Sequence, residues 1–454
     1  MSHTHTPTRR HFLSLSSRLA ALGVGSMVLG RAGSVYAADA TAQDPVQDYK
    51  ALVCLYLFGG NDGNNLIVPL EPAQHAAYQN IRGNLALTGG KLLPPIADAA
   101  GQQFALHYGL PELQALYAAG DLAVVLNTGV LQRPLTRAQY LAGGDAPTNL
   151  FSHSDQTVQA QTGMPTANGT GWGGRLLDCW GNGDTLSAIS LASPALFLQG
   201  FNVGGNAIQP GVTLNLSGMN FWPPSESALR RQALDTILTQ DGGSLLRATA
   251  NAAMTDGLQL ASTLQGGAAT SAAQGFPGTA LGRQLQEVAR LIEMRSQQGP
   301  GRQVFFVTLD GFDTHGSQDW QHWYLLSTLS LALSVFHNVI GNLGLSSQVT
   351  AFTQSEFGRT LQPSGSGSDH AWGSHQLVLG GAVNGGVYGQ MPTFALGGPN
   401  DANNRGVWIP TIATSQFGAT LGRWFGASEP NVAWAFPTLG QFASSDVGFM
   451  DVPA

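Results

Sequence analysis

The sequence predicts an α/β domain with a mostly parallel central sheet and helices on both faces. Its strand-like runs are apolar throughout instead of alternating with polar residues, which is typical of strands buried on both faces of a parallel sheet. These runs alternate along the chain with helix-like stretches, the order that an open α/β sheet requires. In such sheets the functional residues gather at the carboxyl ends of the strands.

Four apolar runs are each followed by a polar loop, and they are the predicted strands: residues 51–58, 122–126, 304–309 and 349–353. The first run is closed by Gly-Gly-Asn-Asp-Gly at residues 59–63, which predicts a tight turn. The predicted helices lie between the strands, at residues 110–119, 279–297 and 320–343. Four sets of polar residues are therefore expected at one edge of the sheet.

The first 37 residues predict a twin-arginine export signal. Arg9 and Arg10 precede an apolar segment that runs to about Leu29 and ends in small residues, and we expect cleavage after Ala37. A membrane anchor is disfavoured, because it needs about 20 apolar residues and this segment is shorter and interrupted by Arg18. We therefore expect a periplasmic or extracellular protein, with the export machinery as a partner and no stable membrane anchor.

Residues 38–454 are predicted to form the folded domain, with an insertion or lid around residues 180–275, where Gly, Ser and Ala are abundant. A nucleic-acid partner is not expected, because the net charge is −7 and Lys50 and Lys91 are the only lysines. Cys54 and Cys179 could form a disulfide, but Cys54 lies in an apolar run, so buried and unpaired thiols are favoured.

Four histidines in loop motifs lie next to or near carboxylates: His153, His315, His370 and His375. Imidazole and carboxylate together are the usual ligands of borderline divalent ions, so the set predicts a zinc or manganese site. Each residue alone has a simpler interpretation, because a lone Asp often caps a turn or a helix and a lone His is often a hydrogen-bonded core residue. The joint occurrence of these residues favours the metal site.

Five motifs spread over nearly the whole mature chain carry a resemblance to a known family: GGNDGNN (59–65), SHSDQ (152–156), GFDTH (311–315), SEFGRT (355–360) and GSDHAWG (367–373). In these motifs the chain resembles the domain-of-unknown-function family 1501. That family is grouped with alkaline phosphatases, sulfatases and cofactor-independent phosphoglycerate mutases. The resemblance implies an alkaline phosphatase-like three-layer sandwich and, with it, two-metal hydrolysis of a phosphate or sulfate ester of a small molecule or a polymer.

The resemblance also implies roles for individual residues. By position, Asp62 is similar to the superfamily's first metal ligand and Ser152 to its nucleophile, with Ser154 as the second candidate. The other implied metal ligands are Asp313, His315, Asp369, His370 and His375. Glu356 is an alternative ligand because it follows a strand directly, where the superfamily places an Asp-His pair; His375 would then be structural.

Arg359 has two open interpretations. Its guanidinium could stabilise charge on a transferring phosphoryl or sulfuryl group, or it could form a structural ion pair with Glu356. A formylglycine sulfatase is disfavoured, because neither Cys54 nor Cys179 lies in the required motif, and Cys clusters typical of redox cofactors are missing from the sequence. The alternative function is a non-catalytic binding or assembly protein of the envelope that keeps this fold.

Overall fold

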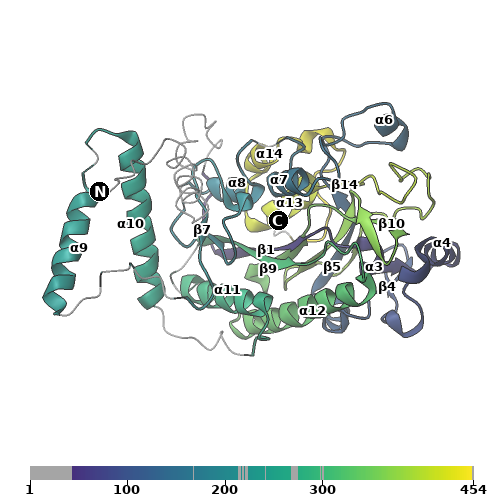
Figure 1. Cartoon of the computed structure of the whole chain (residues 1–454), viewed down its shortest axis with the longest axis horizontal. Helices are drawn as coiled ribbons and strands as arrows, with labels where there is room; N and C mark the ends of the chain where they lie inside the picture. The colour runs from purple at the N-terminus through teal and green to yellow at the C-terminus, as the bar shows by residue number, and fades with distance from the viewer. Residues whose placement is uncertain are drawn as a thin grey trace, which may run out of the picture.

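The computed structural model describes residues 43–451, except residues 167, 182, 213–215, 217–218, 220–222, 241, 267–274, 297 and 299–300. The predicted export signal therefore lies outside the described residues. A central sheet separates two layers of helices, with α11 and α12 on one face and α7, α8, α13 and α14 on the other (Figure 1). This three-layer arrangement confirms the predicted fold class.

The central sheet has nine strands in the order β13-β5-β12-β9-β1-β8-β6-β7, with β14 paired to β5. Strand β12 is antiparallel to β5 and β9, whereas the other pairs in the sheet are parallel. The strands are β1 (Tyr49–Phe58), β5 (Leu122–Gly129), β6 (Ala188–Ser190), β7 (Asn206–Ala207), β8 (Gly301–Asp310), β9 (Val349–Gln354), β12 (Ser374–Leu379), β13 (Gly386–Tyr388) and β14 (Ile412–Ala413). All four predicted strands are thus present.

Strand β1 is apolar throughout because both of its faces are covered. Val53 and Leu55 pack into the core beneath α11 and α12, whereas Cys54 and Tyr56 point into the core on the opposite face. The register with β8 runs without interruption from Tyr49↔Gly301 to Phe58↔Asp310, so the two strands end level with each other. The loops that follow β1 and β8 consequently meet at the same edge of the sheet.

The predicted helices are confirmed as α5 (Pro111–Ala119), α11 (Ala280–Ser296) and α12 (Gln318–Asn342). Helix α12 is long and apolar enough to cross a membrane, but it packs against α5 and α11 and contributes Leu326, Leu329 and Leu333 to the core. The opposite layer contains α7 (His153–Thr162), α8 (Trp172–Asp178), α13 (Thr414–Phe425) and α14 (Glu429–Ala435). Both cysteines are buried and unpaired, as predicted.

Two smaller sheets flank the central one. The hairpin β10 (Arg359–Ser364) and β11 (Gly367–His370) carries residues that sequence alone placed in a loop, and its turn uses Gly365 at a φ of +65°. The other sheet consists of β2 (Ile67–Pro69), β3 (Ile96–Ala97) and β4 (Gln103–Leu106). Near them lie α3 (Gly63–Leu66) and α4 (Pro72–Arg82), and α6 (Arg137–Leu141) lies further along the chain.

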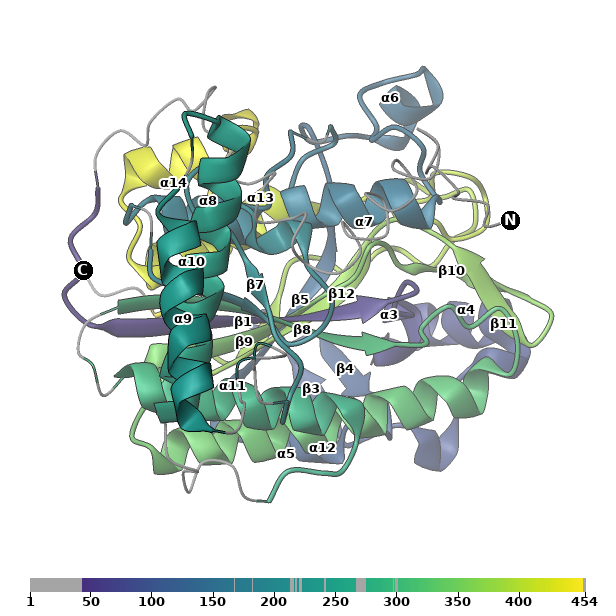
Figure 2. The same ribbon diagram turned by 60° about the vertical axis from the view of Figure 1, so that its left-hand side comes forward.

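Residues 180–275 contribute both to the sheet and to a separate arm. Strand β6 pairs with β8 and extends the central sheet, and β7 pairs with β6. The arm consists of α9 (Pro224–Leu238) and α10 (Leu245–Gly266), which project from one end of the molecule (Figure 1; Figure 2 shows them from another side). Helix α9 has no buried residue.

Candidate metal centre

Five candidate ligands from three parts of the chain come together at the carboxyl end of β8. His153 begins α7, Asp313 and His315 lie in the loop after β8, and Asp369 and His370 end β11. They form two overlapping groups, His153–Asp313–His370 and His315–Asp369–His370, within each of which the ligand atoms lie within 4.8 Å of one another. Both groups have the composition of a borderline divalent-ion site.

Glycine at position 59 allows the first loop to approach this centre. Gly59 has a φ of +113°, and a Cβ atom there would lie 2.2 Å from the backbone nitrogen of Asp313. Any side chain at this position would therefore push the β1 loop away from the loop that carries Asp313 and His315. The predicted Gly-Gly turn thus allows the ends of β1 and β8 to pack closely against each other.

The imidazole of His153 is held by Glu356. Its Nδ1 lies 2.9 Å from Glu356 Oε1, which also accepts a hydrogen bond from the backbone nitrogen of Gly59 at 2.8 Å. A carboxylate accepts, so Nδ1 carries the proton, and in the neutral ring the lone pair of Nε2 is available. Nε2 of His153 is buried and has no hydrogen-bond partner among the described residues. A carboxylate that orients a histidine in this way is typical of metal sites.

His370 is oriented in the same manner by a backbone carbonyl. Its Nδ1 lies 2.7 Å from the carbonyl oxygen of Phe151, which can only accept, so Nδ1 donates and Nε2 again presents its lone pair. Phe151 has a φ of +76°, a conformation that non-glycine residues rarely adopt. The segment just before α7 thus fixes His370 through its carbonyl and supplies His153 two residues later.

Both Nε2 atoms face the same carboxylate oxygen. Oδ1 of Asp313 lies 3.6 Å from Nε2 of His153 and 3.4 Å from Nε2 of His370. In the neutral rings both Nε2 atoms are acceptors, like Oδ1, so a cation bound between the three atoms would stabilise their convergence. A group of two histidines and one carboxylate leaves coordination positions open for water or substrate. The residues therefore fit a divalent metal ion.

The electrostatics of the centre follow from these contacts. The hydrogen bond to Glu356 raises the pKa of His153, against a smaller opposing effect of burial. Burial lowers the pKa of His370. Burial would raise the pKa of Asp313, but Arg359, His315 and His153 together outweigh it and lower the pKa. Asp313 is therefore held as the carboxylate that a metal requires.

In the group of His315, Asp369 and His370, the carboxylate already forms an ion pair. Nε2 of His315 lies 3.0 Å from Nε2 of His370 and 2.9 Å from Oδ1 of Asp313. Asp369 forms an ion pair with Arg405 at 3.0 Å and accepts a hydrogen bond from the backbone nitrogen of His370. A metal in this group would compete with Arg405 for the Asp369 carboxylate.

Asp62 lies outside both groups. Its carboxylate is fully buried, forms an ion pair with Arg82 and accepts hydrogen bonds from the side chain of Gln318 and the backbone of Asn64. Burial raises the pKa of Asp62, against the opposing effect of Arg82. Asp62 caps the short helix α3, which is the simpler interpretation that its turn sequence allowed.

His375 also lies outside both groups. It sits on β12, where its Nδ1 accepts a hydrogen bond from the backbone nitrogen of Asn127 at 2.8 Å, and burial lowers its pKa to about 3. Arg359 is fully buried and forms an ion pair with Asp313, not with Glu356. Its guanidinium also donates to the carbonyl oxygens of Gly60 and Ser368, so its hydrogen-bonding capacity is used within the protein.

The two candidate serines are placed differently. Ser152 is the N-cap of α7, where its hydroxyl accepts from the backbone nitrogen of Asp155 and donates to the Asp155 carboxylate. Ser154 lines an open depression of about 670 Å³ together with His153, Asp313 and Glu356. Of the two hydroxyls, that of Ser154 is therefore the one in the pocket of the candidate metal centre.

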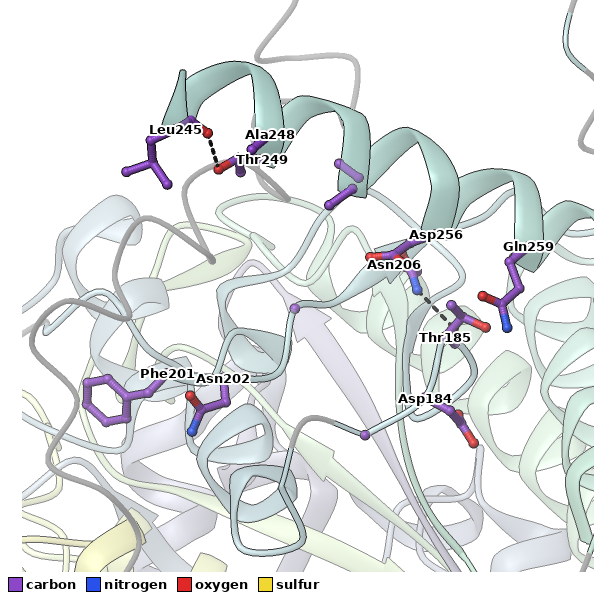
Figure 3. A pocket seen from close by; sticks show the side chains of 14 residues that line it. Asp184, Thr185, Phe201, Asn202, Asn206, Leu245, Ala248, Thr249, Asp256 and Gln259 are labelled. Atoms are coloured by element: carbon purple, nitrogen blue, oxygen red, sulfur yellow. Dashed lines mark hydrogen bonds between the residues drawn. The ribbon is translucent and has the colours of Figure 1, made fainter. Parts of the chain in front are cut away.

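A larger cavity lies elsewhere among the described residues. It has a volume of about 830 Å³ and lies between α10 and the loops around Asp184 and Phe201 (Figure 3). Among the described residues, its lining contains two carboxylates, Asp184 and Asp256, but no histidine and no cysteine.

Comparison with known proteins gives distant structural likenesses. The chain resembles "Crystal structure of Ps i-CgsB in complex with k-i-k-neocarrahexaose" at 9% identity and a TM-score of 0.35, over 85% of this chain and 74% of that one. It also resembles "The Crystal Structure of a Protein in the Alkaline Phosphatase Superfamily from Vibrio parahaemolyticus" at 11% identity and a TM-score of 0.31, over 90% and 77%. Likenesses at such low TM-scores say nothing about activity or substrate.

No curated protein matches the sequence. The family described as "Protein of unknown function (DUF1501)" matches residues 49–405, which include β1, the helix that begins at His153, and the hairpin with His370. That stretch holds every side chain of the candidate metal centre and its orienting partner Glu356. The chain therefore belongs to the DUF1501 family.

Proposed function

We propose that this protein is a metal-dependent hydrolase of phosphate or sulfate esters. The observation that supports it is the convergence of Nε2 of His153 and Nε2 of His370 on the carboxylate of Asp313. We place one ion in this group; the overlapping group of His315, Asp369 and His370 is the alternative position, because Nε2 of His370 has a single lone pair and can bind only one ion at a time. Zinc or manganese suits these ligands.

A bound divalent ion would lower the pKa of a nearby hydroxyl or water and offset negative charge on the ester oxygens. The protein's own residues hold the site for that chemistry. Glu356 orients His153, the carbonyl of Phe151 orients His370, and Arg359 fixes Asp313. Arg359 is a positioning residue in this proposal, because its donors are already engaged in the protein interior.

The proposed nucleophile is a serine hydroxyl at the start of α7. Ser152 is the candidate that the family resemblance implies, and Ser154 is favoured by its place in the pocket. Alanine substitution of each serine distinguishes the two candidates when turnover of bis-p-nitrophenyl phosphate and p-nitrophenyl sulfate is measured. We expect Ser154→Ala to abolish turnover and Ser152→Ala to lower mainly the stability of α7, by about 1 kcal/mol for a lost N-cap. Equal activity in both variants would refute a serine nucleophile.

A non-catalytic envelope protein that keeps the fold is the second candidate. The depression is open and shallow, and the hydroxyl of Ser152 is occupied by Asp155. This candidate predicts no bound metal ion or one, and no turnover of either ester, whereas the hydrolase predicts turnover that is lost on chelation. We further propose export through the twin-arginine pathway, supported by the N-terminal Arg9-Arg10 motif. Replacing both arginines with lysine should leave the precursor in the cytoplasm.

A further inference from the structure

We propose that an aromatic surface on the first turns of α12 binds the sugar rings of a glycan. The surface consists of Trp320, Trp323 and Tyr324, with Tyr108 beside them, and we call it the aromatic platform. It also names the substrate class: a glycan with largely uncharged rings that carries a phosphate or sulfate ester. That last step rests on the proposed function, whereas sugar binding itself does not.

The platform is exposed and ordered by its own contacts. Trp320 is 60% exposed, Tyr324 55% and Trp323 40%, although such large rings are normally buried. Their spacing of three and four residues places them on one face of the helix. The ring of Trp323 stacks on that of Tyr108, with centroids 6.3 Å apart and an angle of 14° between the planes. The orientation of this ring is thus fixed before any ligand binds.

The chemistry of the platform suits sugars. An aromatic ring has a negative face, which attracts the weakly positive C–H groups on the face of a pyranose. Beside the rings, Lys91 and Asp319 form an exposed ion pair at 2.7 Å, which offers a donor and an acceptor to sugar hydroxyls. A sugar ring has apolar C–H faces and polar edges, so the apolar ring faces and the neighbouring ion pair of the aromatic platform complement it.

The platform is tied to the candidate metal centre. Gln318, at the start of α12, hydrogen-bonds Asp62 and the hydroxyl of Ser368, which lies next to Asp369 on β11. Trp320 follows His315 by only five residues, so their Cα atoms lie at most about 18 Å apart. A glycan of a few rings spans that distance, so one chain could contact both places.

A membrane surface is the rival occupant, because Trp and Tyr are also common at bilayer interfaces. Adsorption to anionic lipid needs positive charge near the rings. Lys91 is the only lysine in this region, it is paired with Asp319, and the chain as a whole carries a net charge of −7. The charge distribution therefore favours a largely uncharged glycan over an anionic membrane.

The test is affinity electrophoresis of the mature protein in gels that contain one of three uncharged glycans: dextran, glycogen or hydroxyethyl cellulose. We expect at least one of these glycans to retard the protein. The double variant Trp320→Ala/Tyr324→Ala keeps the Trp323–Tyr108 stack and should bind roughly tenfold more weakly. The matched control is Leu331→Ala, which removes a residue that is 44% exposed on the same helix and should leave retardation unchanged.

Equal retardation of the double variant and the native protein would overturn the proposal, as would no retardation by any of the three glycans. Sedimentation with phosphatidylethanolamine–phosphatidylglycerol vesicles that is lost in the double variant, without retardation by a glycan, would overturn it in favour of a membrane. A His153→Ala/His370→Ala variant separates this proposal from the hydrolase. Its retardation should persist, so a failed metal centre and a failed platform give different results.

Discussion

Replacing Glu356 with glutamine tests how the candidate metal centre is held. Oε1 of Glu356 accepts hydrogen bonds from Nδ1 of His153 at 2.9 Å and from the backbone nitrogen of Gly59 at 2.8 Å. Glutamine keeps one acceptor oxygen but removes the negative charge that makes His153 a better ligand. Loss of such an orienting partner typically weakens metal binding by about 10- to 100-fold, or about 1.4–2.7 kcal/mol.

The assay is a competition titration of Zn²⁺ between the protein and a chelator of known affinity, with native mass spectrometry to count bound ions. For Glu356→Gln we expect at least about tenfold weaker binding with the same number of ions. Glu429→Gln, which removes the charge of an exposed partner of Arg423, is the control and should not change the affinity. Unchanged affinity would refute the orienting role. Loss of one whole ion would instead show that Glu356 is itself a ligand.

Two further predictions concern stability. Arg82→Met leaves the buried carboxylate of Asp62 without its cation and should lower the free energy of unfolding in urea by about 3–5 kcal/mol; a loss as small as that of Arg133→Met, which breaks an exposed pair, would contradict it. Burial lowers the pKa of His322 and His375 to about 3, so these histidines take up protons on unfolding, and stability present above pH 6.5 is lost as the pH falls toward 3. Metal-free protein should lose about 2 kcal/mol per histidine between pH 8 and pH 5, and unfolding free energies that are equal at the two pH values would contradict this.

The sheet could be predicted because its strands are apolar on both faces. Residues 51–58 and 304–309 have no alternation that another architecture would require, and they became the two central neighbours β1 and β8. The short strands β6 and β7 could not be found, because three and two residues carry no periodicity. The hairpin of β10 and β11 was hidden by its Gly- and Ser-rich turn, which reads as a loop.

The candidate site was only partly predictable. Asp313, His315, Asp369 and His370 were chosen from the sequence and lie together. His153 stood out among the histidines, but family position drew attention to the neighbouring serines, and nothing in the sequence showed that α7 begins over the end of β8. Asp62 and His375 have the same residue types as ligands, yet their partners Arg82 and Asn127 are distant in sequence. Only the folded structure distinguishes a candidate metal ligand from a buried residue of the same type that is hydrogen-bonded within the core.

The most direct test of the central claim is elemental analysis of the mature protein purified after export, with the His153→Ala/His370→Ala variant beside it. We expect one zinc or manganese ion per native chain and none in the variant, with the fold kept by circular dichroism. A native protein that contains no divalent metal, or a variant that keeps the native metal content, would contradict it.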